Sequence, residues 1–371
     1  LANATAELLE FVEHMSLPVS HSLMGKGVLP DDHPFILGMT GFWGTKFIND
    51  KCLNADVVLG LGTRFAEADC SSWEKEYTFD FSQTKLLHID IDPSEIGRNY
   101  PVQIGAVADL KQALKVLNRV AKKLYPQGFK NDALKAEMAA NRSTFKAGLV
   151  AAQQSNAFPM RPERILADAR AVLPRDVIIT TDVGWNKNGV GQQFDIFTPG
   201  SILTPGGFAT MGFGAPAAIG AKIACPDRVV VSLVGDGGFG QNPAMLATAV
   251  ESNVPVIWVI MNNCAFGTIA GLQLAHYGTT VGTLFFKDGQ PFQADFAAIA
   301  RAYGAEGVRV TSADEFKPAL EQAMASNRPF VIDVAMQNAP VETAGHWNIM
   351  DIYSPGKKVH HADTSALQNR A

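Results

Sequence analysis

The sequence contains little charge, and several recognition signals are missing from its 371 residues. Charged residues make up 18% of the chain, and the formal net charge at pH 7 is -5. Lys and Arg form no basic run, so we expect neither a nucleic-acid partner nor an acidic-membrane partner. The apolar runs, such as Val254 to Met261, are far shorter than the roughly 20 residues that a membrane-spanning helix needs.

Cysteine is also scarce, and the four cysteines stand far apart with no CxxC pair: Cys52, Cys70, Cys225 and Cys264. This spacing fits neither a zinc site nor a disulfide framework, and no signal peptide or targeting pattern is recognisable. We therefore expect a reducing, cytoplasmic location. The chain opens at Leu1 on an amphipathic helix over 5–14, which predicts that the first strand of this α/β unit is missing.

Hydrophobic residues make up 47% of the chain, which is typical of a globular protein with large cores. Short apolar runs predict strands over 55–62, 85–92, 177–181, 229–234, 256–261 and 330–334. Helical patterns follow over 108–124, 216–224, 242–252 and 313–326. Because strands alternate with helices, we expect the α/β class, with two doubly wound domains and mainly parallel sheets. The predicted boundaries are a domain over 1–130, a linker over 131–158, a second domain over 159–338 and a tail or lid over 339–371.

The strongest chemical signal is a pair of motifs in the second domain. Gly235-Asp236-Gly237-Gly238 follows one predicted strand, and Asn262-Asn263 follows the next. The carboxyl ends of parallel strands meet at one edge of a sheet, so Asp236 and Asn263 are expected to lie close together. A carboxylate and a carboxamide offer the hard oxygen ligands that Mg²⁺ prefers. The glycines allow backbone N–H groups to approach phosphates.

These motifs resemble those of thiamine-diphosphate enzymes of the acetolactate synthase and pyruvate oxidase group, and the resemblance covers nearly the whole chain. Segment 206–216, Gly-Gly-Phe-Ala-Thr-Met-Gly-Phe-Gly-Ala-Pro, is similar to a second landmark of that family. Segment 181–186, Thr-Asp-Val-Gly-Trp-Asn, is similar to the part that contacts the diphosphate. The first domain is similar to the family's central domain, and the second to its diphosphate-binding domain.

The resemblance implies a role for each matching residue. Mg²⁺ would be held by the side chains of Asp236 and Asn263 and the carbonyl of Ala265. Met211 would force the cofactor into its bent, reactive shape, and the backbone of Ala209 and Met211 would bind the aminopyrimidine. The diphosphate would be bound by residues of two loops: Gly184, Trp185, Asn186, Gly237 and Gly238.

The first domain carries loops that hold FAD in the flavin-bearing members of the family, including Gly62-Thr63-Arg64-Phe65 and the segment 90–97. Other members keep these loops without flavin, so FAD stays open. Arg64 is a candidate partner for a nucleotide phosphate. The family also needs a Glu from an N-terminal pyrimidine-binding domain that this sequence does not contain. We expect that domain to come from a missing N-terminal segment or another chain, in a homodimer or homotetramer.

The resemblance implies a carbon–carbon bond lyase or ligase that decarboxylates a 2-oxo acid and then performs carboligation or acyl transfer. Two departures argue against a true acetolactate synthase. Ala68 stands where that enzyme has an Arg that binds the carboxylate of the second oxo acid, and Leu272 aligns with its substrate-gating Trp. The expected acceptor is therefore an aldehyde, water, phosphate or an acyl carrier, and the small-molecule substrate is expected to be a 2-oxo acid or an aldehyde. The alternatives are a 2-hydroxyacyl lyase or acyltransferase with the same cofactor, and a non-catalytic scaffold subunit.

Overall fold

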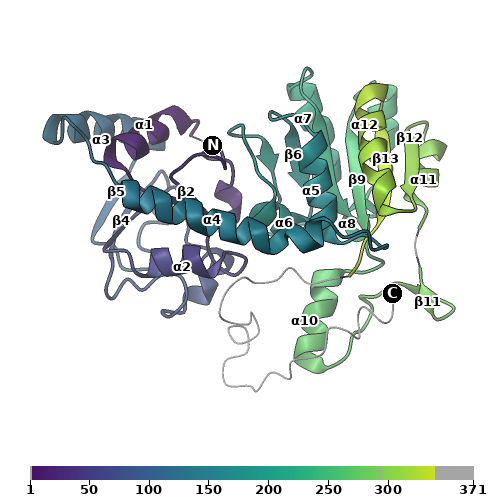
Figure 1. Cartoon of the computed structure of the whole chain (residues 1–371), viewed down its shortest axis with the longest axis horizontal. Helices are drawn as coiled ribbons and strands as arrows, with labels where there is room; N and C mark the ends of the chain where they lie inside the picture. Colours follow the sequence, from purple (N-terminus) through teal and green to yellow (C-terminus); the bar gives the residue numbers. More distant parts are fainter. Residues whose placement is uncertain (1, 293, 339–371) are drawn as a thin grey trace. The chain divides into compact units, whose positions relative to one another are not determined.

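The structure is a computed structural model that describes residues 2–292 and 294–338, and the predicted tail or lid over 339–371 lies outside this range. Within these residues the chain divides into two compact units, 2–146 and 147–338. No helix in the described segments combines the length and the apolar character needed to cross a membrane. Figure 1 shows the course of the chain and labels its elements.

The second unit is built on a six-stranded parallel sheet with the strand order β12-β13-β9-β8-β6-β7. The strands are β6 (Ile178–Thr181), β7 (Ile202–Leu203), β8 (Val230–Gly235), β9 (Ile257–Asn262), β12 (Glu306–Val310) and β13 (Phe330–Ala335). Every residue of β6, β9 and β13 is buried. Strands buried on both faces need continuous apolar runs, which explains why the sequence pattern located them.

Helices cover both faces of this sheet (Figure 1). One face packs against α5 (Pro162–Val172), α6 (Trp185–Gln193) and α12 (Phe316–Ser326). The other packs against α7 (Gly214–Ala224), α9 (Met245–Glu251) and α11 (Phe296–Ala302). The remaining elements are α8 (Asp236–Phe239), α10 (Gly267–Tyr277), η4 (Ala313–Glu315), β10 (Phe286–Lys287) and β11 (Gln290–Pro291). The predicted doubly wound α/β fold is confirmed.

The strand order reverses next to β6, because the chain first places β7 on one side of β6 and then β8 on the other. In open α/β sheets, ligands bind beyond the carboxyl ends of the strands at such a switch point. The loops that follow β6, β7, β8 and β9 are therefore the place where this fold puts a ligand.

The first unit contains two smaller parallel sheets, β1-β2 and β3-β4-β5. Its strands are β1 (Val19–His21), β2 (Ile36–Met39), β3 (Val57–Leu61), β4 (Lys85–Asp90) and β5 (Ile104–Val107). Its helices are α1 (Thr5–Met15), α2 (Lys46–Leu53) and α3 (Leu110–Leu124), with short 3-10 turns at Leu23–Gly25, Glu67–Asp69 and Ser71–Trp73. Buried side chains of α1 and α3, including Phe11 and Leu114, share one core. The region predicted as a linker contains α4 (Asp132–Gln153).

Candidate functional site

Loops that follow neighbouring strands of the large sheet touch one another around Gly237, in the turn after β8. A Cβ atom added to Gly237 would lie 2.6 Å from Cε1 of Phe266, in the loop after β9. It would also lie 3.2 Å from Cε of Met211, in the loop after β7. Motifs far apart in the sequence therefore meet at the switch point, and Gly237 has to lack a side chain for them to do so.

Three oxygen atoms converge in this region with no hydrogen between them. Oδ1 of Asn263 faces Oδ1 of Asp236 at 3.1 Å and the backbone oxygen of Ala265 at 2.9 Å. The amide nitrogen of Asn263 points the other way and donates to Oδ1 of Asn338 at 3.2 Å. Oxygen atoms with partial or full negative charge repel one another at such distances unless a proton or a cation lies among them. Turning the amide around would let its nitrogen donate to both oxygens.

The spacing of these oxygens suits a small divalent cation. Adjacent ligands of an octahedral Mg²⁺, each about 2.1 Å from the metal, lie about 3 Å apart. One carboxylate, one carboxamide and one carbonyl would leave three positions for phosphate oxygens and water. No cluster of three or more His, Cys, Asp or Glu suited to a metal occurs among the described residues. The residues present therefore fit a hard cation that is shared with a phosphate ligand.

Asp236 is strongly affected by its surroundings. Burial raises the pKa of its carboxyl group to about 7, against the opposing effect of the backbone N–H groups of Gly237 and Ala265. A bound cation would favour the anion again. The neighbouring turn is also unusual, because Cys264 has a positive φ of 55° without being glycine. Such a conformation is uncommon and concentrates at functional loops. Cys264 lies directly before Ala265, whose carbonyl oxygen is one of the three converging oxygens.

The loop after β6 contributes backbone groups more than side chains. Gly184, with a φ of 114°, caps the start of α6. The side chain of Trp185 is only 7% exposed and belongs to the core of the sheet. Nδ2 of Asn186 donates to the backbone oxygens of Asp182 at 3.0 Å and Leu233 at 2.8 Å. Because these side chains are engaged elsewhere, the donors that this loop offers to an anion are mainly the main-chain N–H groups at the start of the nine-residue helix α6.

The loop after β7 carries Ala209 and Met211 and reaches the turn after β8. Ala209 has a positive φ of 48° and donates its N–H to the backbone oxygen of Gly206 at 3.3 Å. Met211 is half-buried, with its terminal methyl beside Gly237. The structure thus brings the predicted cofactor residues of all these loops to one end of the sheet.

One residue of this region was not singled out by the sequence pattern. Asp182 follows β6, is 0% exposed and accepts hydrogen bonds from three backbone N–H groups. The only local feature of the sequence that could have pointed to Asp182 is its position, as a carboxylate directly after a buried strand. Its partners lie up to 32 residues away, so the sequence pattern gave no indication of them.

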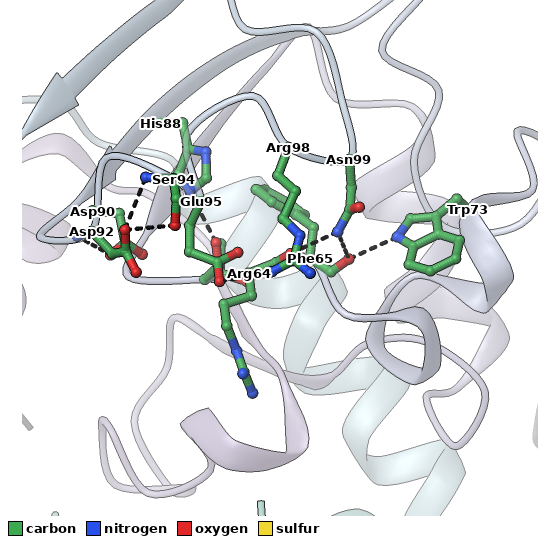
Figure 2. Close-up of polar contacts among 11 residues, drawn as sticks. Arg64, Phe65, Trp73, His88, Asp90, Asp92, Ser94, Glu95, Arg98 and Asn99 are labelled. Carbon is green, nitrogen blue, oxygen red and sulfur yellow. Dashed lines mark hydrogen bonds and ion pairs between the residues drawn. The ribbon is translucent and has the colours of Figure 1, made fainter. Parts of the chain in front are cut away.

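The first unit has a second polar group of residues, at the carboxyl ends of β3 and β4 (Figure 2). The loop after β3 is held by two side chains: Nε1 of Trp73 donates to the backbone oxygen of Phe65 at 2.7 Å, and Nδ2 of Asn99 donates to the same oxygen at 3.1 Å. Figure 2 shows the exposed Arg64 side chain extending away from the carboxylate of Glu95. Oε2 of Glu95 is buried without a hydrogen-bond partner in the described structure.

The loop around Ala68 is tied to its surroundings by local contacts. The backbone oxygen of Ala68 accepts a hydrogen bond from the N–H of Phe42 at 2.9 Å, and its side chain packs against Phe42. Oε1 of Glu67 accepts from the Ser72 hydroxyl at 2.9 Å, and Oδ1 of Asp69 accepts from the N–H of Leu23 at 3.2 Å. Ala68, where the resemblance predicted that an Arg is missing, is therefore a small apolar side chain between two carboxylates in the sequence.

Comparison with known proteins agrees with this arrangement. Residues 182–334 match the family described as "Thiamine pyrophosphate enzyme, C-terminal TPP binding domain", and residues 1–117 match the central domain of the same enzymes. Thiamine pyrophosphate is another name for thiamine diphosphate. The two matches contain the motif loops of the second unit and the two polar loops of the first. The chain belongs to the thiamine pyrophosphate enzymes, as the resemblance of its motifs had predicted.

Curated relatives are similar over most of this chain. A probable acetolactate synthase large subunit of Methanococcus aeolicus is 35% identical over 91% of this chain and 56% of its own length. The glyoxylate carboligase of Escherichia coli O157:H7 is 32% identical over 91% of this chain and 57% of its own length. A putative thiamine pyrophosphate-containing protein of Bacillus subtilis is 30% identical over 92% of this chain and 56% of its own length. The chain therefore spans somewhat more than half the length of these relatives.

Proposed function

We propose that this chain is the cofactor- and metal-binding part of a carbon–carbon bond lyase or ligase that acts on a 2-oxo acid. The observation that carries the proposal is the convergence of Asp236, Asn263 and the carbonyl of Ala265 in the loops after β8 and β9. The reaction class is a decarboxylation followed by carboligation or acyl transfer. Names of relatives such as acetolactate synthase and glyoxylate carboligase support this class.

In this proposal each loop has its own task. Mg²⁺ would be held by the side chains of Asp236 and Asn263 and the carbonyl of Ala265. Met211 would press on the cofactor from below, and the backbone of Ala209 and Met211 would orient its aminopyrimidine. The diphosphate would be bound by Gly184, Trp185, Asn186, Gly237 and Gly238.

Thiamine diphosphate supplies a nucleophilic carbon and an electron sink next to a carbonyl group. The protein's contribution is to orient that cofactor, to neutralise its phosphates and to exclude water. The buried surroundings of Asp236, 5% exposed, would serve the last purpose, because they would keep bulk water from a bound cation. A carboxylate, a carboxamide and a carbonyl give the cation a net ligand charge of only about -1, which leaves it able to attract the diphosphate.

The complete enzyme would include a pyrimidine-binding domain, from a preceding segment or from another chain, and would form a homodimer or homotetramer. The chain's coverage of 56% of its relatives leaves room for such a domain. A cytoplasmic location stays a prediction.

Acceptor choice is the finer part of the proposal. The relatives include acetolactate synthases, so their names do not argue against that activity. The argument against it comes from Ala68, which cannot pair with the carboxylate of a second 2-oxo acid. Stripping water from that carboxylate costs several kcal/mol unless a cation replaces the water. Two cations of the same unit already have partners, since Lys46 pairs with Asp50 at 2.5 Å and Arg98 pairs with Glu95 at 3.0 Å. We therefore propose an aldehyde, water, phosphate or an acyl carrier as the acceptor.

A flavin is a second proposed cofactor, at the polar loops of the first unit. The exposed guanidinium of Arg64, with no ion pair among the described residues, could meet a nucleotide phosphate. The unpartnered Oε2 of Glu95 could accept hydrogen bonds from ribose hydroxyls. The experiment is a visible absorption spectrum of the purified complete enzyme, before and after removal of any flavin. A colourless preparation with full activity would refute a required flavin.

The alternatives differ in what the cofactor is used for. A 2-hydroxyacyl lyase or acyltransferase would use the same site on other substrates. A scaffold subunit would tolerate loss of the metal oxygens, whereas Asp236 and Asn263 are both in place. The test is an assay of the complete enzyme with glyoxylate, pyruvate and 2-hydroxyacyl substrates, with and without thiamine diphosphate. Cofactor-dependent consumption of a 2-oxo acid supports the proposal. Cofactor binding without turnover of any substrate identifies a scaffold.

A further inference from the structure

Asp182 connects three separate loops of the candidate site, although none of the proposed cofactor contacts uses its side chain. Its Oδ1 atom accepts hydrogen bonds from the N–H of Val183 at 2.8 Å and of Gly212 at 3.1 Å. Its Oδ2 atom accepts from the N–H of Gly212 at 3.1 Å and of Gly214 at 2.8 Å. The carboxylate therefore joins the loop after β6 to the loop that carries Met211.

The same carboxylate also lies against the turn after β8. A Cβ atom on Gly238 would stand 2.8 Å from both Cγ and Oδ1 of Asp182, so the main chain of Gly238 approaches the carboxylate closely. Asp182 is thus in contact with segments on which Met211, Gly237 and Gly238 are placed. Moving the carboxylate would move the loop around Met211 relative to Gly237.

The chemistry of the contact requires a carboxylate. Both oxygens face backbone N–H donors, and Asp182 forms no ion pair in the described part of the chain. The donors at Gly212 and Gly214 stand at the start of α7, an 11-residue helix whose positive end favours an anion. An amide has only one acceptor oxygen, so its NH₂ group would face an N–H group wherever it points.

We propose that Asp182 is a positioning residue for thiamine diphosphate, which holds the Ala209–Met211 loop at its working distance from Gly237 and Gly238. The inference rests on the proposed cofactor-binding role of these loops. Asp182 acts through that loop, and it is not proposed to touch the cofactor.

The test compares Asp182→Asn with Asp168→Asn in the complete enzyme. Asp168 lies in α5, is 4% exposed, accepts a hydrogen bond from Nε of Arg164 at 2.6 Å and pairs with Nζ of Lys317 at 3.1 Å. These partners lie in α5 and α12, not in the loops of the candidate site. Both variants lose a buried polar contact, so both are expected to melt at a lower temperature without cofactor. Only Asp182→Asn is expected to raise the cofactor Kd, by at least about tenfold, and to lower kcat while the KM for the 2-oxo acid changes little.

Each outcome decides the matter. An unchanged cofactor Kd and kcat in Asp182→Asn overturns the inference, and so does a loss of affinity in Asp168→Asn that is equal to the loss in Asp182→Asn. If Asp182→Asn does not fold, Gly212→Ala replaces it, because Gly212 has a φ of 88° and donates to both carboxylate oxygens. Wild-type affinity for Gly212→Ala then overturns the inference. If the wild-type enzyme itself does not bind thiamine diphosphate, the proposed function fails instead.

Discussion

Oδ1 of Asn263 lies 3.1 Å from Oδ1 of Asp236, and the carbonyl oxygen of Ala265 lies 2.9 Å from the same Asn263 atom. The amide of Asn263 can meet these two oxygens in two ways. Its oxygen would point inward to share a bound cation with them, and its nitrogen, after the amide is turned around, would donate to both.

Gly237→Ala tests the close approach of the loops. The new methyl group would meet Phe266 at 2.6 Å and the terminal methyl of Met211 at 3.2 Å. We expect the Kd for thiamine diphosphate to rise at least about tenfold, which corresponds to about 1.4 kcal/mol. Calorimetric titration measures this change.

Gly235→Ala is the matched control for that variant, because a Cβ atom at Gly235 meets nothing within 4 Å and its φ is -79°. It adds the same methyl group two residues earlier, at the end of β8. Equal affinities of the two variants would show that the packing around Gly237 has no bearing on the cofactor.

Because of the buried His21, we expect the first unit to lose stability in acid. Burial and the nearby charge of Lys26 lower the pKa of His21 to about 4, while Asp31 opposes the shift. An unfolded His takes up a proton near pH 6.5, so below that pH the unfolded state binds more protons than the folded one. The contribution of neutral His21 is complete above about pH 6.5 and is lost as the pH falls to about 4. Over this pH range the free energy of unfolding should fall by about 3 kcal/mol on account of His21.

The measurement is urea unfolding of the wild type and His21→Asn at about pH 7 and about pH 4.5. The Asn amide can replace the donor that His21 Nδ1 offers to the backbone oxygen of Ser22 at 2.8 Å. The wild type should lose more stability than the variant on acidification. A parallel loss in both proteins would mean that His21 is protonated equally in the folded and unfolded states.

Because Ala68 cannot pair with a second carboxylate, we predict that the complete enzyme condenses two pyruvates poorly. Acetolactate formation should be at least about tenfold slower in kcat/KM than the preferred reaction, or about 1.4 kcal/mol of transition-state binding. Ala68→Arg should raise it, and Ala68→Lys should raise it less because Lys lacks the planar fork that pairs with a carboxylate. The comparison uses aldehyde, water, phosphate and acyl-carrier acceptors. If acetolactate forms in the wild type with the highest kcat/KM of all, another cation replaces the missing Arg.

The sequence predicted those strands of the fold that form continuous apolar runs. The predicted strand 229–234 agrees with β8 to one residue, because a strand covered on both faces must be apolar throughout. By contrast, β12 was missed because it contains Glu306 and Arg309 and only Val310 is buried. The two-residue β7 is too short for any period to show.

The site was predictable where chemistry is carried by residue type, and less so where it depends on orientation. Asp236 and Asn263 follow neighbouring strands, so their proximity could be predicted from the motif order. The burial of the Trp185 ring and the anchoring role of Asp182 depend on packing between distant segments. Local sequence patterns contain no information on such packing.

The metal-dependent affinity for thiamine diphosphate tests the central claim most directly. Calorimetric titrations of the complete enzyme would be run with Mg²⁺ and with a chelator, for the wild type, Asp236→Ala and Asp314→Ala. Asp314 is the control because its side chain is 81% exposed, where loss of an ion pair costs little. We predict tight, Mg²⁺-dependent binding in the wild type and Asp314→Ala, and weak binding in Asp236→Ala that Mg²⁺ does not improve, with the fold retained. A wild-type Kd in Asp236→Ala would contradict the account.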